Sequence, residues 1–424
     1  MRRILSLNSL KLWIFYYLLL LLLFFFAMRP NAEYSIIIRL LFLASTFLPA
    51  FFKLEVLPFV FLCFYGISST SFCVILPTQS FYYLIIIGIG YLLYKHKSIF
   101  CAKSLLVWGY FLFFSLLKLD FNDIFTWLFI AILLGDMIKD KKDMQMLLYA
   151  FIFISLFLSL LFIVHREEFL TQYGSHTLEL EHAGWVNPNT FGAIIAAGGI
   201  LSMSYVTNFL KFKKNVFLSI VCIITVILSF FVIVLNSSRG ALFAFIIPAF
   251  VMVLFSNLKL SIKILFIIFS SILIVLMLDG GTFDLLFYRL QDETFSTGGS
   301  RAIIWEAKMQ YFFREANLLE LFFGIGLPET LKIGTTKMFS THNDFVTSLI
   351  AFGVIGFCLF VYFVTYPIIK ANKKNKFFIC MLSLYLLVEM CVLEPFFRAK
   401  IVVIMFYIFV LKYSLLNLNT DTIK

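Results

Sequence analysis

The chain has 424 residues, of which 62% are hydrophobic and 13% are charged, and its formal net charge is +11. A soluble protein of this length exposes too much surface to reach a mean hydropathy of +1.01. Repeated apolar runs of about 20 residues instead predict an all-α polytopic membrane protein. Segments of alternating apolar and polar residues are missing from the sequence, which argues against a transmembrane barrel.

The positive charge is gathered in short clusters between the apolar runs. Cytoplasmic loops of membrane proteins carry such clusters, so the charge indicates topology and not nucleic-acid binding. A basic start followed by a long apolar run, without a small-x-small cleavage signal, predicts an uncleaved first span and a cytoplasmic N-terminus. The clusters lie at residues 2–3, 95–97, 139–142, 211–214 and 370–376.

The apolar segments predict fourteen spans with both ends of the chain in the cytoplasm. Several in the first third are short or closely spaced, so a count of about 12 (12–14) also fits the pattern. The segments lie near 12–28, 35–52, 56–76, 80–95, 100–117, 121–138, 145–164, 190–210, 216–235, 240–256, 260–278, 343–369, 377–395 and 399–415.

Two outer loops divide the chain into three parts. A transmembrane bundle covers 1–278 and includes a short extracytoplasmic loop at 165–189. A large extracytoplasmic loop covers 279–342, and the remaining transmembrane helices with a cytoplasmic tail cover 343–424. Residues 301–321 of the large loop have helical periodicity, which predicts an amphipathic helix at the membrane interface with Ser300 as its cap.

The seven cysteines all fall in apolar segments, and none forms a CxxC pair. We therefore expect small buried apolar residues and neither a disulfide framework nor a metal site. They are Cys63, Cys73, Cys101, Cys222, Cys358, Cys380 and Cys391.

Two arginines are candidates for binding an anion. Arg239, in "NSSRG", is expected in a very short outer turn, a face on which Lys and Arg are under-used. An arginine that snorkels to the interface is the structural alternative. Arg301, after "TGGS", is expected at the start of the loop helix, where free N–H groups and a guanidinium attract anions. An ordinary solvated charge is its alternative.

His342, Asn343 and Asp344 stand together at the mouth of an apolar run. A histidine is the side chain best suited to move a proton near neutral pH. The structural alternative is an interfacial histidine beside a helix cap supplied by Asn343 or Asp344.

The stretch "HAGWVNPNTFGAIIAAGG" predicts a turn at a helix entrance, formed around Asn187 and Asn189. A cap and a turn, with close helix packing at three following glycines, explain most of it. The two amides are also candidates for binding sugar hydroxyls or phosphate. The glycines are Gly192, Gly198 and Gly199.

Carboxylates occur in the penultimate span, at Glu389 and Glu394. An ionisable residue inside a membrane segment indicates function by default. Glu394 and Arg398 are four residues apart, which predicts one helix face, and an ion pair that holds two helices together is the competing interpretation.

The sequence has no Walker A, GxGxxG or HExxH motif, so we expect neither a nucleotide nor a metal cofactor. By the predicted topology, Arg239, Arg301 and His342 share the outer face. Two arginines suit a diphosphate leaving group, and a histidine suits removal of a proton from an attacking hydroxyl. This combination favours glycosyl transfer from a lipid-linked sugar diphosphate.

These residues also carry a family resemblance. The spacing His–Asn–x9–Gly–x–x–Gly, from His342 to Gly356, resembles the pattern of the O-antigen ligases of Gram-negative bacteria. The motifs "SSRG" at 237–240 and "NPNTFGAII" at 187–195, with the arginine four residues before Trp305, resemble the wider O-antigen ligase and polymerase superfamily.

The resemblance implies transfer of O-antigen polysaccharide from undecaprenyl diphosphate to lipid A–core. It implies a multi-pass protein of the bacterial inner membrane with a periplasmic active site, about 12 spans, and no need for ATP or a metal. The implied partners are this donor, this acceptor and membrane lipids, without nucleic acid. The implied catalytic residue is His342, and the implied diphosphate-binding residues are Arg239 and Arg301. Asn343, Asn187, Asn189, Glu394 and Arg398 are supporting candidates.

Three other functions are also compatible with the sequence. A polysaccharide polymerase uses the same donor but extends another lipid-linked chain. A protein O-oligosaccharyltransferase fits less well, because the chain lacks an extended C-terminal periplasmic portion. A flippase for lipid-linked oligosaccharide predicts internal repeats and broken helices near the middle of the bilayer.

Overall fold

The structure is a computed structural model, and all regular structure in its described residues is helical. The residues that it describes are 105–117, 141–164, 188–210, 215–236, 238–279, 301–333, 341–394, 396–397 and 401–415, with the single residues 44 and 63. Predicted segments before residue 100, and the one at 121–138, lie outside this part of the chain. From 145–164 onward, each predicted apolar segment corresponds to a helix with closely similar ends.

Five described helices are long and apolar enough to cross a membrane. They are α7 (Lys141–Val164), α9 (Pro188–Val206), α10 (Val216–Leu235), α17 (Asp344–Lys370) and α18 (Lys373–Val392). The apolar helices α11 (Arg239–Phe255) and α19 (Ile401–Leu415) are shorter. Two further apolar helices are α5 (Leu105–Leu117) and α12 (Leu260–Asp279).

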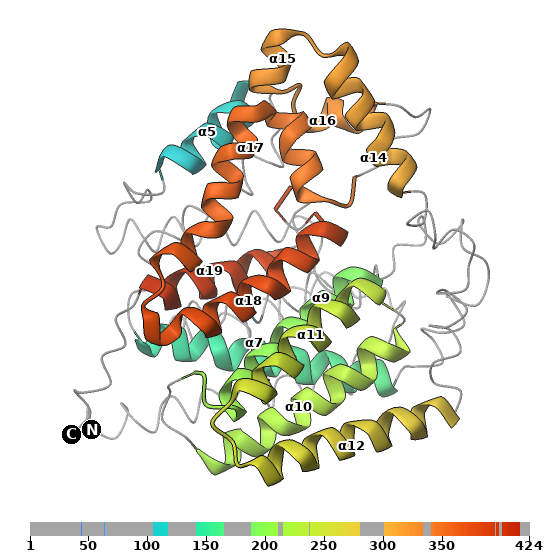
Figure 1. Ribbon diagram of the computed structural model, residues 1–424, viewed down its shortest axis with the longest axis vertical. Helices are drawn as coiled ribbons and strands as arrows, with labels where there is room; N and C mark the ends of the chain where they lie inside the picture. Colours follow the sequence, from blue (N-terminus) through green and yellow to red (C-terminus); the bar gives the residue numbers. More distant parts are fainter. Residues whose placement is uncertain are drawn as a thin grey trace.

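Helix α9 lies within the bundle and contacts α7, α10, α11, α18 and α19 (Figure 1). Its glycines allow this close packing, as predicted. A Cβ atom at Gly198 would lie 2.3 Å from Cβ of Ser155, and one at Gly199 would lie 2.9 Å from Cβ of Ser229. The two serine hydroxyls are 3.0 Å apart, so this narrow interface is also hydrogen-bonded.

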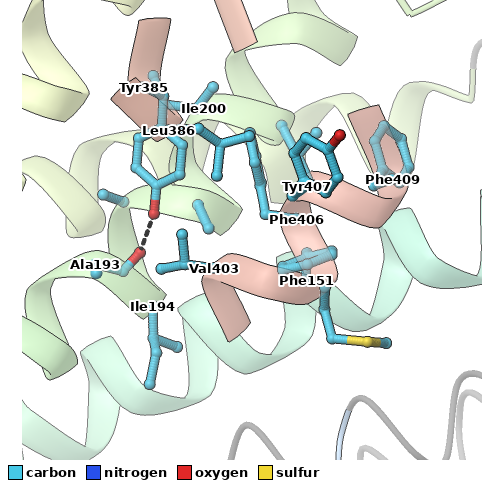
Figure 2. Packing of buried hydrophobic residues seen from close by; sticks show 14 of the residues in the cluster. Phe151, Ala193, Ile194, Ile200, Tyr385, Leu386, Val403, Phe406, Tyr407 and Phe409 are labelled. Carbon is cyan, nitrogen blue, oxygen red and sulfur yellow. Dashed lines mark hydrogen bonds between the residues drawn. The ribbon is translucent and has the colours of Figure 1, made fainter. Parts of the chain in front are cut away.

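A buried aromatic layer joins α9 to α18 and α19 (Figure 2). The Tyr385 hydroxyl donates to the carbonyl of Ala193 over 2.7 Å, which satisfies a phenol with no exposed surface. The ring of Tyr385 meets that of Phe406 edge-on at 4.6 Å, and Phe406 in turn lies 6.0 Å from Phe151 of α7. These helices have few polar side chains that could fix their positions by hydrogen bonds. The aromatic contacts therefore help to fix how they pack.

Helix α17 is folded back on itself at Gly353, which has φ 67° and ψ −172°. The rings of Phe345 and Phe360 lie 5.8 Å apart, whereas fifteen residues of straight helix span about 22 Å. The apolar run 343–369, which is long and apolar enough to cross a membrane as predicted, therefore forms two helical halves that meet at Gly353. Glycine suits this corner because left-handed backbone is costly for residues with a side chain.

The carbonyls just before this break are all hydrogen-bonded. The carbonyl of Ile350 accepts from the N–H of Ile325 at 3.1 Å, and that of Ala351 accepts from Gly326 at 2.8 Å. The carbonyl of Phe352 accepts from the hydroxyl of Tyr110 on α5 at 3.0 Å. These hydrogen bonds stabilise the break, because each unpaired backbone group in an apolar environment would cost several kcal/mol.

Residues 301–333 form a small unit, the loop subdomain, which packs against α17. It contains α14 (Arg301–Gln310), the π-helix η5 (Tyr311–Glu315), α15 (Leu318–Phe323) and α16 (Leu327–Thr330). Figure 1 shows α14, α15 and α16 gathered beside α17 at one end of the molecule, away from α10 and α12. The predicted helix over 301–321 begins at Arg301 but is interrupted after Glu315, and Asn317 starts α15 with a capping box. Ser300 lies outside the described residues.

The expectation that the cysteines are buried is partly wrong. Cys63 and Cys222 are buried, but Cys358 and Cys391 are exposed. A thiol is weakly polar, so it is tolerated on the apolar outer surface of a membrane helix as well as in its core.

Candidate functional site

His342 lies in the short turn that enters α17. Its φ is 51°, in the left-handed region that residues with a side chain seldom adopt. Such conformations cost free energy and gather at functional sites, where the surrounding contacts hold them. The imidazole is half-buried, so it remains within reach of a molecule at the protein surface.

The residues on either side of His342 are fixed by hydrogen bonds. The Asn343 side chain accepts from the N–H groups of Phe345 at 2.9 Å and Val346 at 3.1 Å, and so caps α17. The indole of Trp305 donates to the carbonyl of Thr341 at 2.7 Å. This bond attaches the turn to α14, so the loop subdomain holds the histidine in place.

Glu394 is fully buried behind this turn and accepts hydrogen bonds from the hydroxyls of Thr341 and Thr347. Its φ is 54°, so it resembles His342 in having a left-handed backbone. Sequence reasoning missed both threonines. The available signal was a hydroxyl at position 347, in the first turns of an otherwise apolar helix.

Glu394 does not lie on a helix, so the interpretation that it shares a helix face with Arg398 is wrong. Helix α18 ends at Val392, and the proline that follows Glu394 disfavours helical backbone at that residue. Arg398 itself lies outside the described residues. The segment after α18 instead folds onto the start of α17, where the N–H of Phe396 donates to the buried Asp344 carboxylate over 3.2 Å.

Each of the two arginines is the first residue of a helix. Arg301 begins α14, and Arg239 begins α11. Burial lowers the pKa of Arg301, the positive charge of Arg239 lowers it further, and the carboxylate of Glu394 opposes both. The structure therefore brings these three charged groups near enough to act on one another. Glu394 also accepts a hydrogen bond from Thr341, the residue before His342, so one carboxylate lies near both Arg301 and the turn that holds His342.

Asn189 has a positioning role beside Arg239. Its side-chain oxygen accepts from the hydroxyl of Ser238 at 3.1 Å, which fixes the start of α11 against the start of α9. A Cβ atom at Gly240 would lie 2.7 Å from a Val392 methyl, so the end of α18 is also adjacent. Asn187 lies outside the described residues.

This arrangement suits an anionic ligand beside a group that moves protons. Two guanidinium groups offer bidentate donors to phosphate oxygens. Their partial burial strengthens the electrostatic attraction to an anion, because less water screens the charges. The carboxylate of Glu394 opposes the lowering of the pKa of Arg301 by burial and by Arg239. An imidazole next to such an anion site can accept the proton of a hydroxyl that attacks there.

A comparison with protein families finds a match to part of the chain. Residues 224–361 match the family model described as O-antigen ligase. This segment belongs to the O-antigen ligase family. The matched residues include Arg239, Arg301 and His342, as well as the α17 break at Gly353, whereas Glu394 lies beyond the match. No curated protein matches the chain.

Proposed function

We propose that the protein is an O-antigen ligase, which transfers polysaccharide from undecaprenyl diphosphate to lipid A–core. The observation that supports the proposal is the buried Glu394 carboxylate, which lies near Arg301 and accepts a hydrogen bond from Thr341, the residue before His342. The family match over residues 224–361 supports a glycosyltransferase of the ligase and polymerase superfamily.

In the proposed reaction, a hydroxyl of the acceptor sugar attacks the anomeric carbon of the first sugar of the donor. A bond forms between that oxygen and that carbon, and the bond from the carbon to the diphosphate oxygen breaks. His342 accepts the proton of the hydroxyl, and undecaprenyl diphosphate leaves. Arg239 and Arg301 offset the negative charge that grows on the diphosphate, which lowers the barrier most when the site is already arranged for it.

The proposed setting is the periplasmic face of the inner membrane. The donor and acceptor are both lipids, so their polar head groups meet at the surface of the bilayer. His342 is half-buried at the start of the apolar helix α17, beside α14, and this position suits a site at the bilayer surface.

A polysaccharide polymerase is the second candidate, because it uses the same donor and belongs to the same superfamily. The broken helix α17 is a feature that transporters also use, so a flippase is tested in the same experiment. A strain that lacks the gene is examined by lipopolysaccharide gel. The ligase proposal predicts bare core together with accumulated lipid-linked polymer. Core that bears one repeat unit would indicate a polymerase, and bare core without periplasmic polymer would indicate a flippase.

A further inference from the structure

A pocket of about 440 Å³ opens in the loop subdomain between η5, α15 and α16. Its size falls in the range of sites for small molecules. None of the proposed catalytic or diphosphate-binding residues lines it, so it is separate from the site above. Its polar and larger wall residues are Tyr311, Glu315, Glu320, Glu329, Lys332 and Ile333.

The charges of the pocket define the hydrogen-bonding character of its ligand. Three glutamates face a single lysine, and the Lys332 ammonium already pairs with Glu329 at 2.8 Å. Ionised carboxylates only accept hydrogen bonds, so the ligand must donate them. A diphosphate is anionic and accepts hydrogen bonds, so it suits this wall less well than the arginines.

An oriented aromatic ring forms another wall. The Tyr311 hydroxyl donates to Glu320 at 3.2 Å, and the same carboxylate accepts from the N–H of Asn317 at 3.0 Å. Burial raises the pKa of Tyr311, and the hydrogen bond and charge of Glu320, followed by the charge of Glu315, raise it further. The phenol thus stays protonated, and its ring is held beside carboxylates that have remaining acceptor positions.

A metal ion does not fit these carboxylates. Within the described residues, no group of three or more His, Cys, Asp or Glu side chains is arranged to hold one. The backbone of this wall is the π-helix Tyr311–Glu315, a form that often marks functional sites. An aromatic face beside separated acceptors suits a sugar ring, whose C–H face is apolar and whose hydroxyls donate.

The pocket is connected to the catalytic turn through α17. Ile325 lines the pocket, and its N–H donates to the carbonyl of Ile350. Ile350 follows His342 by eight residues, which correspond to about 12 Å along a helix. A glycan whose end lies at His342 can therefore place a more distant sugar unit in the pocket.

We propose that this pocket is a saccharide subsite of the transferase, which binds a neutral or amino-bearing sugar unit of a substrate glycan. It rests on the proposed function, because it assigns the pocket to a substrate of that reaction. It adds a second recognition point, built from Tyr311 and the glutamates, to the diphosphate-binding arginines.

Photo-crosslinking in intact cells tests the subsite with the glycans that the cell itself supplies. The full chain carries Ile333→p-benzoylphenylalanine at the pocket wall or, as a matched control, Glu306→p-benzoylphenylalanine on the exposed side of α14. After irradiation, the purified protein is stained for carbohydrate. We expect an adduct at position 333 that is at least about fivefold stronger than at 306, and its loss with Tyr311→Ala but not with Tyr311→Phe. Equal signals at 333 and 306 would overturn the subsite.

Membrane-vesicle kinetics and the deletion gel separate this proposal from the proposed function. Tyr311→Ala and Glu315→Gln should raise the KM for glycan about tenfold and leave kcat unchanged, whereas Glu306→Gln should change neither. Unchanged KM in both pocket variants, with bare core in the deletion strain, would reject the pocket and keep the transferase. Normal lipopolysaccharide in the deletion strain, with a strong adduct at 333, would reject the transferase while the pocket still binds sugar.

Discussion

The hydroxyl of Thr341 donates a hydrogen bond to the carboxylate of Glu394, 53 residues further along the chain. This contact joins the turn that holds His342 to the segment after α18, next to the charge of Arg301. The Glu394 carboxylate therefore both binds the turn and acts on the charge of Arg301.

Removing the hydroxyl of Thr341 tests this positioning role. Thr341→Val leaves the buried Glu394 with one hydroxyl donor fewer, and such a loss costs about 1–3 kcal/mol. We expect transfer to fall at least about tenfold through kcat, because His342 is then poorly placed, while Thr341→Ser keeps the hydroxyl and the activity. Equal activity of the Val and Ser variants in membrane vesicles would show that the contact does not position the histidine.

The corner at Gly353 provides a second test. Alanine there must adopt φ 67°, and its Cβ would lie 2.3 Å from the backbone oxygen of Phe322. We expect Gly353→Ala to lower the free energy of unfolding by about 2 kcal/mol or more, measured by thermal unfolding in detergent. Gly109→Ala on α5 is the control, since its Cβ meets no atom within 4 Å. If Gly353→Ala lowers the free energy of unfolding by no more than Gly109→Ala does, the folded-back geometry of α17 is contradicted.

Binding of a diphosphate should stabilise the protein through the two arginines. The lowered pKa of Arg301 shows that the fold holds its protonated form at a cost, caused by burial and by Arg239. A bound anion offsets this cost and favours the folded state. We expect inorganic pyrophosphate to raise the Tm by about 2 °C or more, and Arg301→Gln to abolish the increase.

The matched control for this experiment is Arg314→Gln, which removes an exposed arginine of the same subdomain. It should retain the full pyrophosphate effect. A Tm increase that survives Arg301→Gln but disappears with Arg314→Gln would place the anion elsewhere on the loop subdomain.

Hydropathy predicted most of the described helices, and local signals identified polar residues at the starts of several of them. Apolar run length is a local property, and Arg239, Arg301 and Asn343 stand at helix starts that capping and charge rules identify. The corner at Gly353 could not be predicted, because an isolated glycine in an apolar run is compatible with a straight helix. Its carbonyls are satisfied by Ile325, Gly326 and Tyr110, which are distant in sequence.

The hydrogen bonds of Glu394 could not be predicted either, because its partners are distant in the sequence. Its spacing to Arg398 suggested a local helix pair, whereas its partners are the hydroxyls of Thr341 and Thr347. Hydrogen bonds between such distant positions depend on the packing of α17 against the end of α18. No periodicity in the sequence encodes that packing.

The most direct test of the central claim uses purified protein in lipid with a polysaccharide on undecaprenyl diphosphate and with lipid A–core. We expect the wild-type protein to form polysaccharide-bearing lipid A–core. His342→Ala, Arg301→Ala and Arg239→Ala should each lower the rate by at least about a hundredfold, while Arg314→Ala should not. Transfer at the wild-type rate by His342→Ala would contradict the site described here.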